Sequence, residues 1–483
     1  MTGAVAGGSP LTTDAGLFAV SLGGNAVDAA VAAQLCACVA EPLLTGLGGG
    51  GLATIRFAGR THVCDFFSDA PSKRGPMTSV ELDFGPAKQI FHVGPGSITV
   101  PGLPAGLWAM HQRWGRIPME RLVKPAIDAT RGVRVSAAFA RVNELLWPIQ
   151  KLSAEASALF GPRGSPLVEG DTFRNPALAG TLLDFARNGP ESFRTGQVAR
   201  LLLEASDTLT PDDLKNYAPA FREALAIPYR GGTVYLPAEP SQGGIQVARS
   251  LQLLAEGPMP TPFGFDHVER LAGAMDEAER SVSGEMAELL YRPGFRREYL
   301  GSGYTTHLST VDGDGNAVAI TSSLGETAGL VLGDTGVCPN NFLGEEDVNP
   351  PDYDTPVGRR LITMCCPTVL THNGAVYALG SGGSSRIRSA LLHGVVYLVD
   401  HKLDPATVPG LPRCHMQDGV LRLESFDRPP GLVEELRDEH PELVEFDRRG
   451  MYFGGLHIAG LAPRGFVGGG DARRSGDFQV YTG

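Results

Sequence analysis

Small and apolar residues recur at helical spacing along the first 40 residues and again through the middle of the chain. Residues 12–40 begin with Thr and Asp, which suit a helix N-cap, and continue with small residues on every face. This pattern predicts one tightly packed, buried helix that ends at Glu41, before Pro42. Further helical segments are expected at 107–114, 119–131, 177–187, 245–255 and 265–295.

Alternating and β-branched residues predict strands at 52–57 and within 221–236, and they dominate the last third of the chain. The predicted strands in that last third cover 306–311, 317–322, 366–371 and 375–379. Two Asp-Gly pairs between residues 312 and 315 favour a turn that joins the first two of these strands. Because no internal repeat or low-complexity linker interrupts the chain, we expect one composite globule of mixed α and β structure.

A run of glycines between residues 46 and 51 formally fits the GxGxxG pattern of a phosphate-binding loop. Such a loop follows a strand and opens a helix, whereas here a predicted helix precedes the glycines and a predicted strand follows them. We therefore expect these glycines to allow close approach of backbone segments, since glycine tolerates crowding and positive φ.

Charge and cysteine content narrow the possible partners. The formal net charge is -12, from 41 basic and 53 acidic residues, without a run of like charges, which argues against a nucleic acid or an anionic membrane as partner. A small molecule fits better. No signal peptide or long apolar stretch is visible, so we expect a cytoplasmic protein. The seven cysteines, an odd number, are interpreted as buried thiols, and neither they nor the histidines form a metal motif.

The block from Gly303 to Ala319, with Thr305-Thr306-His307 near its start, closely resembles the start of the small subunit in the gamma-glutamyltransferase family. Further matches to the family occur in the same order along nearly the whole chain. They lie at 24–33, 41–42, 48–51, 100–106, 340–341 and 380–387.

This resemblance implies an α+β fold of the N-terminal-nucleophile hydrolase type, a four-layer αββα sandwich. It also implies self-cleavage between Tyr304 and Thr305, which would give a large subunit of residues 1–304 and a small subunit of residues 305–483. The two subunits would come from the same precursor and form one composite domain, a heterodimer. Two such heterodimers could pair further, and this alternative stays open. No metal or organic cofactor is implied.

Thr305 would then be the nucleophile, and its newly freed α-amino group the base. A threonine hydroxyl needs a base within hydrogen-bond reach, and an α-amino group with a pKa of about 8 suits that task. The uncut precursor should therefore be inactive. By the same resemblance, Ser323 matches a threonine whose hydroxyl bonds the nucleophile, and the backbone N–H groups of Gly383 and Ser384 form the oxyanion hole.

Two further polar residues of the matched motifs are expected to have structural roles. His307 is interpreted as a core histidine satisfied by a neighbour. Arg386 is expected to hold the oxyanion loop, through carbonyl groups or through an acidic residue such as Glu345 or Asp347.

The substrate pocket departs from the family pattern. Phe67 stands where most members carry the arginine that binds the substrate α-carboxylate, and a phenyl ring cannot make that charged pair. A family serine pair aligns with Thr363 and Met364. In the family, a second set of polar residues binds the substrate α-amino group. Of this set Asn341 is kept, whereas the other polar residues of the family align with Gly325, Phe342 and Glu345.

The leading hypothesis is therefore hydrolysis or acyl transfer through a Thr305 ester, on a substrate less polar at its α-carbon than glutathione. Three alternatives stay open. They are a carbon-carbon bond hydrolase in the biosynthesis of an alkylproline antibiotic unit, a cephalosporin-acylase-like amidase, and a non-catalytic binding homologue. The retention of Thr305, Ser323, Gly383 and Asn341 argues against the last of these.

Overall fold

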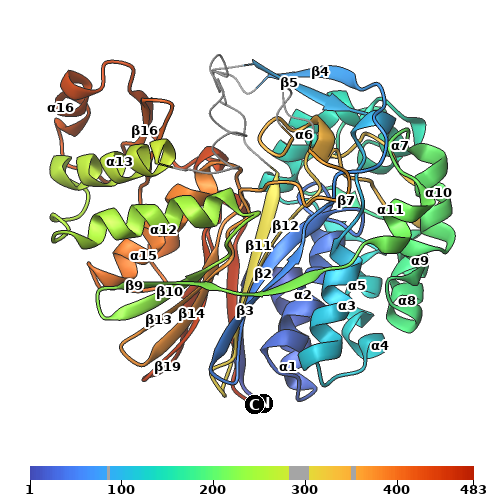
Figure 1. Ribbon diagram of the computed structural model, residues 1–483, viewed down its shortest axis with the longest axis horizontal. Coiled ribbons are helices and arrows are strands. Elements are labelled where there is room, and N and C mark those ends of the chain that lie inside the picture. The colour runs from blue at the N-terminus through green and yellow to red at the C-terminus, as the bar shows by residue number, and fades with distance from the viewer. Residues whose placement is uncertain (84–87, 282–303, 350–354) are drawn as a thin grey trace.

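Two antiparallel sheets face each other in the centre of the computed structural model, which describes residues 1–83, 88–281, 304–349 and 355–483. The first sheet has seven strands in the order β20-β1-β11-β12-β2-β3-β8. These strands are β1 (Gly3–Gly7), β2 (Gly50–Phe57), β3 (Arg60–Phe66), β8 (Ala220–Glu223), β11 (Thr305–Asp312), β12 (Ala317–Ser323) and β20 (Asp477–Tyr481). Because β1 pairs with β20, the two ends of the chain lie side by side (Figure 1).

The second sheet has six strands in the order β19-β18-β14-β13-β10-β9. They are β9 (Leu225–Tyr229), β10 (Gly232–Leu236), β13 (Thr368–His372), β14 (Ala375–Gly380), β18 (His457–Ala462) and β19 (Gly465–Gly469). Mostly small side chains, such as Ala4, Ala319, Ala378 and Ala459, fill the space between the two sheets. Such small residues allow two sheets to pack face to face as a sandwich.

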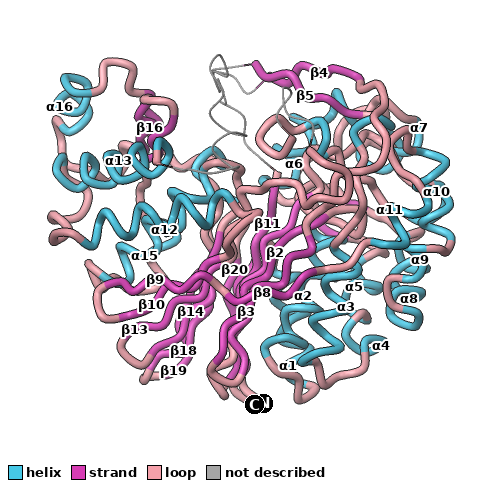
Figure 2. The backbone as a smooth tube through the Cα atoms, viewed as in Figure 1, coloured by secondary structure: helices cyan, strands magenta, loops and turns pink. Residues whose placement is uncertain are grey.

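Helices cover the outer face of each sheet and complete a four-layer αββα arrangement (Figures 1 and 2). The layer on the first sheet contains α1 (Pro10–Ser21), α2 (Ala26–Ala40), α3 (Leu103–Trp114), α4 (Met119–Leu122), α5 (Lys124–Ala129), α6 (Ala137–Gln150), α7 (Ala154–Phe160), α8 (Leu178–Asn188), α9 (Glu191–Arg194), α10 (Gln197–Ala205) and α11 (Pro211–Asn216). The layer on the second sheet contains α12 (Gln242–Ala255), α13 (Phe265–Arg280) and α15 (Arg386–Val399). The predicted fold class is confirmed.

Smaller elements surround these layers. They are the hairpin of β4 (Thr78–Asp83) and β5 (Lys88–Val93), the pair β6 (Val133–Arg134) and β7 (Thr172–Phe173), the three-stranded sheet of β15 (Cys414–Gln417), β16 (Val420–Glu424) and β17 (Val444–Phe446), and the helix α16 (Leu432–Glu439). No helix in the described residues is both long and apolar enough to cross a membrane. All seven cysteines are buried free thiols.

The single helix predicted over residues 12–40 was wrong, because the structure breaks it into α1 and α2. The side chain of Asn25 caps α2 by accepting hydrogen bonds from two backbone N–H groups, and the Asp28 carboxylate accepts the N–H of Asn25 in return. This capping box satisfies backbone donors that a continuous helix would satisfy internally. Gly23, at φ 88°, allows the chain to turn between the two helices.

Other predicted segments differ at their ends. The predicted helix 119–131 is two short helices, α4 and α5, and the predicted helix 245–255 already begins at Gln242. Of the predicted helix 265–295, α13 accounts for Phe265–Arg280, and residues 282–295 lie outside the described residues.

The glycine run after α2 brings backbone segments into close contact, as predicted. A Cβ atom on Gly48 would lie 2.1 Å from the carbonyl oxygen of Cys338, and one on Gly49 would lie 2.0 Å from that of Ser323. Real Cβ atoms do not approach other atoms so closely, so these two positions require glycine. The contacts fix the end of β12, where Ser323 lies.

The hairpin of β11 and β12 sets the geometry of the predicted catalytic strand. Its turn is held by Asp312, whose carboxylate accepts the N–H groups of Asp314 and Asn316. Alternate side chains of β11 point to opposite faces. Leu308 packs in the helix-side core, whereas Val311 packs between the sheets. Thr305 lies on the same face as Val311, and Thr306 on the same face as Leu308.

Candidate active site

Thr305 is the first residue of β11 and is almost fully buried. It pairs with Ser323 at the end of β12, in the register of the hairpin. The guanidinium of Arg474 donates a hydrogen bond of 3.0 Å to the Thr305 carbonyl oxygen. Burial lowers the pKa of Arg474 to about 10, so it stays charged at neutral pH. Strand pairing and this hydrogen bond from a charged donor fix the backbone of Thr305.

The Ser323 hydroxyl is directed at the peptide bond that precedes Thr305. It donates a hydrogen bond of 2.8 Å to the carbonyl oxygen of Tyr304 and accepts one of 2.9 Å from the N–H of Gly325. The resemblance predicts a bond from Ser323 to the Thr305 hydroxyl, whereas in this uncut chain Ser323 bonds the carbonyl of the preceding residue. A donor on that oxygen draws electron density from the carbonyl carbon, the atom that a nucleophile attacks.

The loop between β14 and α15 lies directly against Thr305. A Cβ atom on Gly382 would lie 1.9 Å from the Thr305 carbonyl oxygen, so only glycine fits there. Gly383 has φ 123° and Ser384 has φ 48°, a left-handed conformation that costs a non-glycine residue about 1 kcal/mol. The Ser384 hydroxyl donates to the carboxylate of Asp347, which compensates for part of this strain.

The backbone donors of this loop remain available. Among the described residues, the N–H groups of Gly383 and Ser384 donate no hydrogen bond, whereas their carbonyls accept from Arg386 and Ile387. Arg386 donates from Nε to the carbonyl oxygen of Tyr452 at 3.2 Å, a carbonyl contact of the predicted kind, and from Nη1 to the hydroxyl of Ser385 in the loop at 3.1 Å. Two free donors on a rigid loop beside Thr305 are the arrangement that stabilises an oxyanion.

A small pocket of about 20 Å³ brings most of the predicted site residues together. It is lined by Phe67, Thr305, Ser323, Phe342, Glu345, Asp347, Val348, Thr363, Met364, Cys365, Ser384 and Ile387. The Phe67 and Phe342 rings pack together, with their centroids 4.6 Å apart, and give the pocket an apolar wall. In the uncut chain this volume accommodates little more than one water molecule, so a substrate needs the pocket to open.

Three carboxyl groups that form no ion pair within the described part of the chain lie at or behind this pocket: Glu326, Glu345 and Asp347. Glu345 and Asp347 each have a buried oxygen without a hydrogen-bond partner among the described residues. Burial raises the pKa of Glu345 well above its ordinary value, and Glu326 and Asp347 raise it further. Burial also raises the pKa of Glu326 to about 8. The described lining of the pocket contains no Lys, Arg or His that could pair with these carboxyls.

The remaining predicted residues make hydrogen bonds and close contacts at the pocket or next to it. Gly325, at φ 68°, leaves room for Glu345, since a Cβ atom there would lie 2.2 Å from the Glu345 carboxylate. Asn341 accepts the N–H of Glu326 at 2.8 Å and donates to its carboxylate at 3.3 Å. Thr363 accepts the N–H of Cys365. His307 is a core histidine, bonded to the hydroxyls of Thr321 and Ser309, as predicted.

The sequence interpretation missed Glu326 and Arg474, and it considered Asp347 only as a partner for Arg386. Arg474 reaches Thr305 across 169 residues, and no local pattern indicates such a contact. Glu326 is isolated between small residues in a loop that has no periodicity. The one available signal for Asp347 was the acidic run from 345 to 347, which follows the matched residue Asn341.

Comparisons with known proteins agree with this geometry. The model of the gamma-glutamyltranspeptidase family matches residues 12–287 and 278–481. The glutathione hydrolase proenzyme of Escherichia coli is 30% identical, over 89% of this chain and 84% of the relative. The acylase ACY 1 proenzyme of a Pseudomonas species is 28% identical, over 97% of this chain and 91% of the relative.

Solved structures show the same fold. The cephalosporin acylase of Bacillus halodurans superimposes with a TM-score of 0.82 at 24% identity, over 100% of this chain and 96% of that one. LmbA2991HD superimposes with a TM-score of 0.80 at 21% identity, over 100% of this chain and 98% of that one. Named relatives at this level of similarity are hydrolases and acylases. This chain is therefore an enzyme that belongs to the gamma-glutamyltranspeptidase family, within the N-terminal-nucleophile hydrolases.

Proposed function

We propose that the chain is a proenzyme that cuts itself before Thr305 and then uses Thr305 as the nucleophile of a hydrolase or acyltransferase. The observation that carries the proposal is the hydrogen bond of 2.8 Å from the Ser323 hydroxyl to the Tyr304 carbonyl. The Escherichia coli and Pseudomonas relatives described above are both named proenzymes. Cleavage would leave residues 1–304 and 305–483 as the two subunits of one domain.

In the first stage, the Thr305 hydroxyl attacks the Tyr304 carbonyl carbon, and the peptide C–N bond breaks as the nitrogen takes a proton. The product is an ester between Tyr304 and the Thr305 side chain. Water then hydrolyses this ester, which frees the Tyr304 carboxylate, the Thr305 hydroxyl and the Thr305 α-amino group. Ser323 stabilises the carbonyl oxygen as it gains negative charge.

In the second stage, the free α-amino group of Thr305 takes the proton of its own hydroxyl, which attacks the acyl carbon of a substrate. The N–H groups of Gly383 and Ser384 receive the oxyanion, and the leaving amine takes the proton. Water or an amine then resolves the Thr305 ester. The chain's own groups supply nucleophile, base and oxyanion donors.

The pocket favours an acyl group without a carboxylate at the position where glutathione has one. Phe67 and Phe342 form an apolar wall, against which burying an unpaired substrate carboxylate is costly. An amide acylase fits this pocket, and the ACY 1 relative, which covers 97% of the chain, favours it as the specific activity. The carbon-carbon bond hydrolase stays an alternative, because the same nucleophile and donors serve both reactions.

A paired assay tests the substrate class. Purified, cleaved enzyme is incubated with phenylacetyl-p-nitroanilide and, separately, with gamma-glutamyl-p-nitroanilide, and the mass of the 305–483 fragment is recorded during turnover. We expect release of p-nitroaniline and acyl-labelled fragment with the uncharged acyl group only. Faster turnover of the gamma-glutamyl compound would contradict the proposed pocket chemistry, and an unlabelled fragment during turnover would contradict the Thr305 ester.

A further inference from the structure

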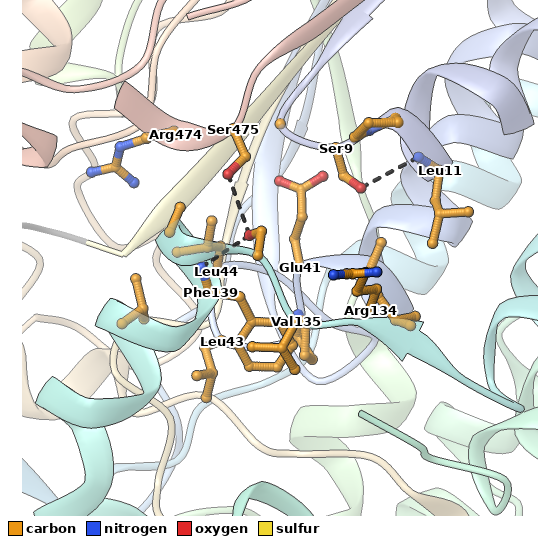
Figure 3. Close-up of a pocket in the computed structure, with 18 of the residues that line it drawn as sticks. Ser9, Leu11, Glu41, Leu43, Leu44, Arg134, Val135, Phe139, Arg474 and Ser475 are labelled. Atoms are coloured by element: carbon orange, nitrogen blue, oxygen red, sulfur yellow. Dashed lines mark hydrogen bonds between the residues drawn. The ribbon is translucent and has the colours of Figure 1, made fainter. Parts of the chain in front are cut away.

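A second, much larger cavity of about 500 Å³ lies on the helix side of the first sheet (Figure 3). The start of α1, the loop after α2 and the start of α6 enclose it, and Arg474 and Ser475 reach it from the C-terminal segment. It shares no lining residue with the Thr305 pocket. Its size is typical of sites that bind drug-sized molecules.

Most of the cavity wall is apolar. The side chains that form this wall include Leu11, Leu43, Leu44, Val135, Phe139 and Met451. They come from four separate segments of the chain. Packing the apolar part of a ligand against such a wall stabilises the complex by about 25 cal/mol for each Å² of apolar surface removed from water.

One end of the cavity is polar and carries Glu41. Its carboxylate lies between the side chains of Ser9 and Ser475 (Figure 3) and is almost fully buried. Thr12 donates to one carboxylate oxygen at 2.7 Å, and Thr306 donates to the other. Each oxygen keeps a further lone pair for a ligand. Burial raises the pKa of Glu41, so its ionised form gains from a nearby positive charge.

The other charged side chains that line the cavity do not occupy its polar end beside Glu41. Arg474 lowers the pKa of Glu41, but its Nη1 donates to the Thr305 carbonyl oxygen, on the strand side. Arg134 and Glu169 are exposed and carry opposite charges. At the polar end, the lone pairs of Glu41 and of the hydroxyls of Ser9 and Ser475 can all accept hydrogen bonds.

We infer that this cavity is a binding site for an amine carried on an apolar scaffold, with the ammonium group on Glu41 and the scaffold against the apolar wall. An ammonium group has three donors, which suit the Glu41 carboxylate and the two hydroxyls. The site is distinct from the acyl pocket, because Thr306 faces Glu41 while Thr305 faces the opposite side of β11. Its occupant therefore touches the support of the nucleophile and not the reacting atoms.

Three isosteric probes test the inference by calorimetric titration at neutral pH: 2-phenylethylamine, 2-phenylethanol and phenylacetate. The titrations use the full chain carrying Thr305→Ala, so that binding is measured without cleavage or turnover. We expect the amine to bind at least about tenfold more tightly than the alcohol, as an ion pair worth about 1.4 kcal/mol requires, and the acid most weakly. Equal binding of all three, or no binding of the amine, would overturn the inference.

Two variants locate the binding. Ala138→Trp places a large side chain at a partly exposed position of the cavity wall and should abolish amine binding. Glu41→Gln keeps the size of the side chain but removes its charge, and it should reduce amine affinity to that of the alcohol. Unchanged amine binding in Ala138→Trp would place the amine elsewhere and refute the site, even if Glu41→Gln failed to fold.

Discussion

At the scale of single residues, Ser323 is the side chain that contacts the proposed cleavage site. Its only hydroxyl hydrogen goes to the carbonyl of Tyr304, and its oxygen accepts from Gly325. The resemblance predicted that this residue lies beside Thr305. The atom that it bonds was not predictable, because that depends on the tight turn after β12 and on the backbone contacts of the glycine run.

Ser323→Ala should slow self-cleavage about 100-fold, because the loss of one donor to a developing oxyanion typically costs that much. Ser322→Ala is the matched control, since Ser322 lies on the same strand but bonds Thr45 and Gln34. The appearance of the two fragments is followed by intact mass against time. Equal cleavage rates in Ser323→Ala and Ser322→Ala would remove the proposed role of Ser323.

At the scale of elements, strands were predicted better than helix boundaries and loops. Alternation along β11 and β12 indicated both strands and their turn. The boundary between α1 and α2 was missed because small residues cover every face of both helices, although Asn25 and Asp28 are a capping-box pair. The loops that carry Glu326 and Asp347 have no periodicity, so only the folded chain reveals that their carboxyls meet.

The contact of Phe67 after β3 with Phe342 shows why one substitution should not restore gamma-glutamyl specificity. In Phe67→Arg, the new guanidinium would lie beside Glu345 and Asp347, which line the same pocket, and would pair with them and not with a substrate carboxylate. We expect no efficient turnover of gamma-glutamyl-p-nitroanilide. Phe67→Leu, which keeps the wall apolar, serves as control for folding and self-cleavage. Robust gamma-glutamyl turnover by Phe67→Arg would refute this account of the pocket.

At the scale of the whole molecule, the two sheets and their helical layers bury charged groups around β11. The αββα class followed from the resemblance, since the hydrophobic pattern alone indicated only mixed α and β structure. Distant segments meet at β11: Glu41 comes from just after α2 and contacts Thr306, and Arg474 comes from just before β20 and contacts Thr305. Such contacts follow from the closed fold and have no local sequence signal.

The buried carboxyls should make the stability of the uncut protein depend on pH. The pKa of Glu326 is raised from 4.5 to about 8, chiefly by burial, so the folded protein retains a proton that the unfolded chain releases. Its contribution to stability is full below pH 4.5 and is lost as the pH rises through about 8. The melting temperature of Thr305→Ala, recorded from about pH 5 to about pH 9, should therefore fall less steeply when Glu326→Gln is added.

The exposed Glu434→Gln, made in the same background, is the control for Glu326→Gln. It should leave the slope of melting temperature against pH unchanged. Identical slopes in all three proteins would show that Glu326 releases its proton at the same pH in the folded and unfolded states.

The central claim is that Thr305 becomes the N-terminal nucleophile of a self-cut enzyme. The most direct measurement is the intact mass of purified wild-type protein beside that of Thr305→Ala. The account predicts two wild-type fragments, residues 1–304 and 305–483, and a single uncut chain for the variant. A single uncut chain for the wild type, or equal cleavage of the variant, would contradict it.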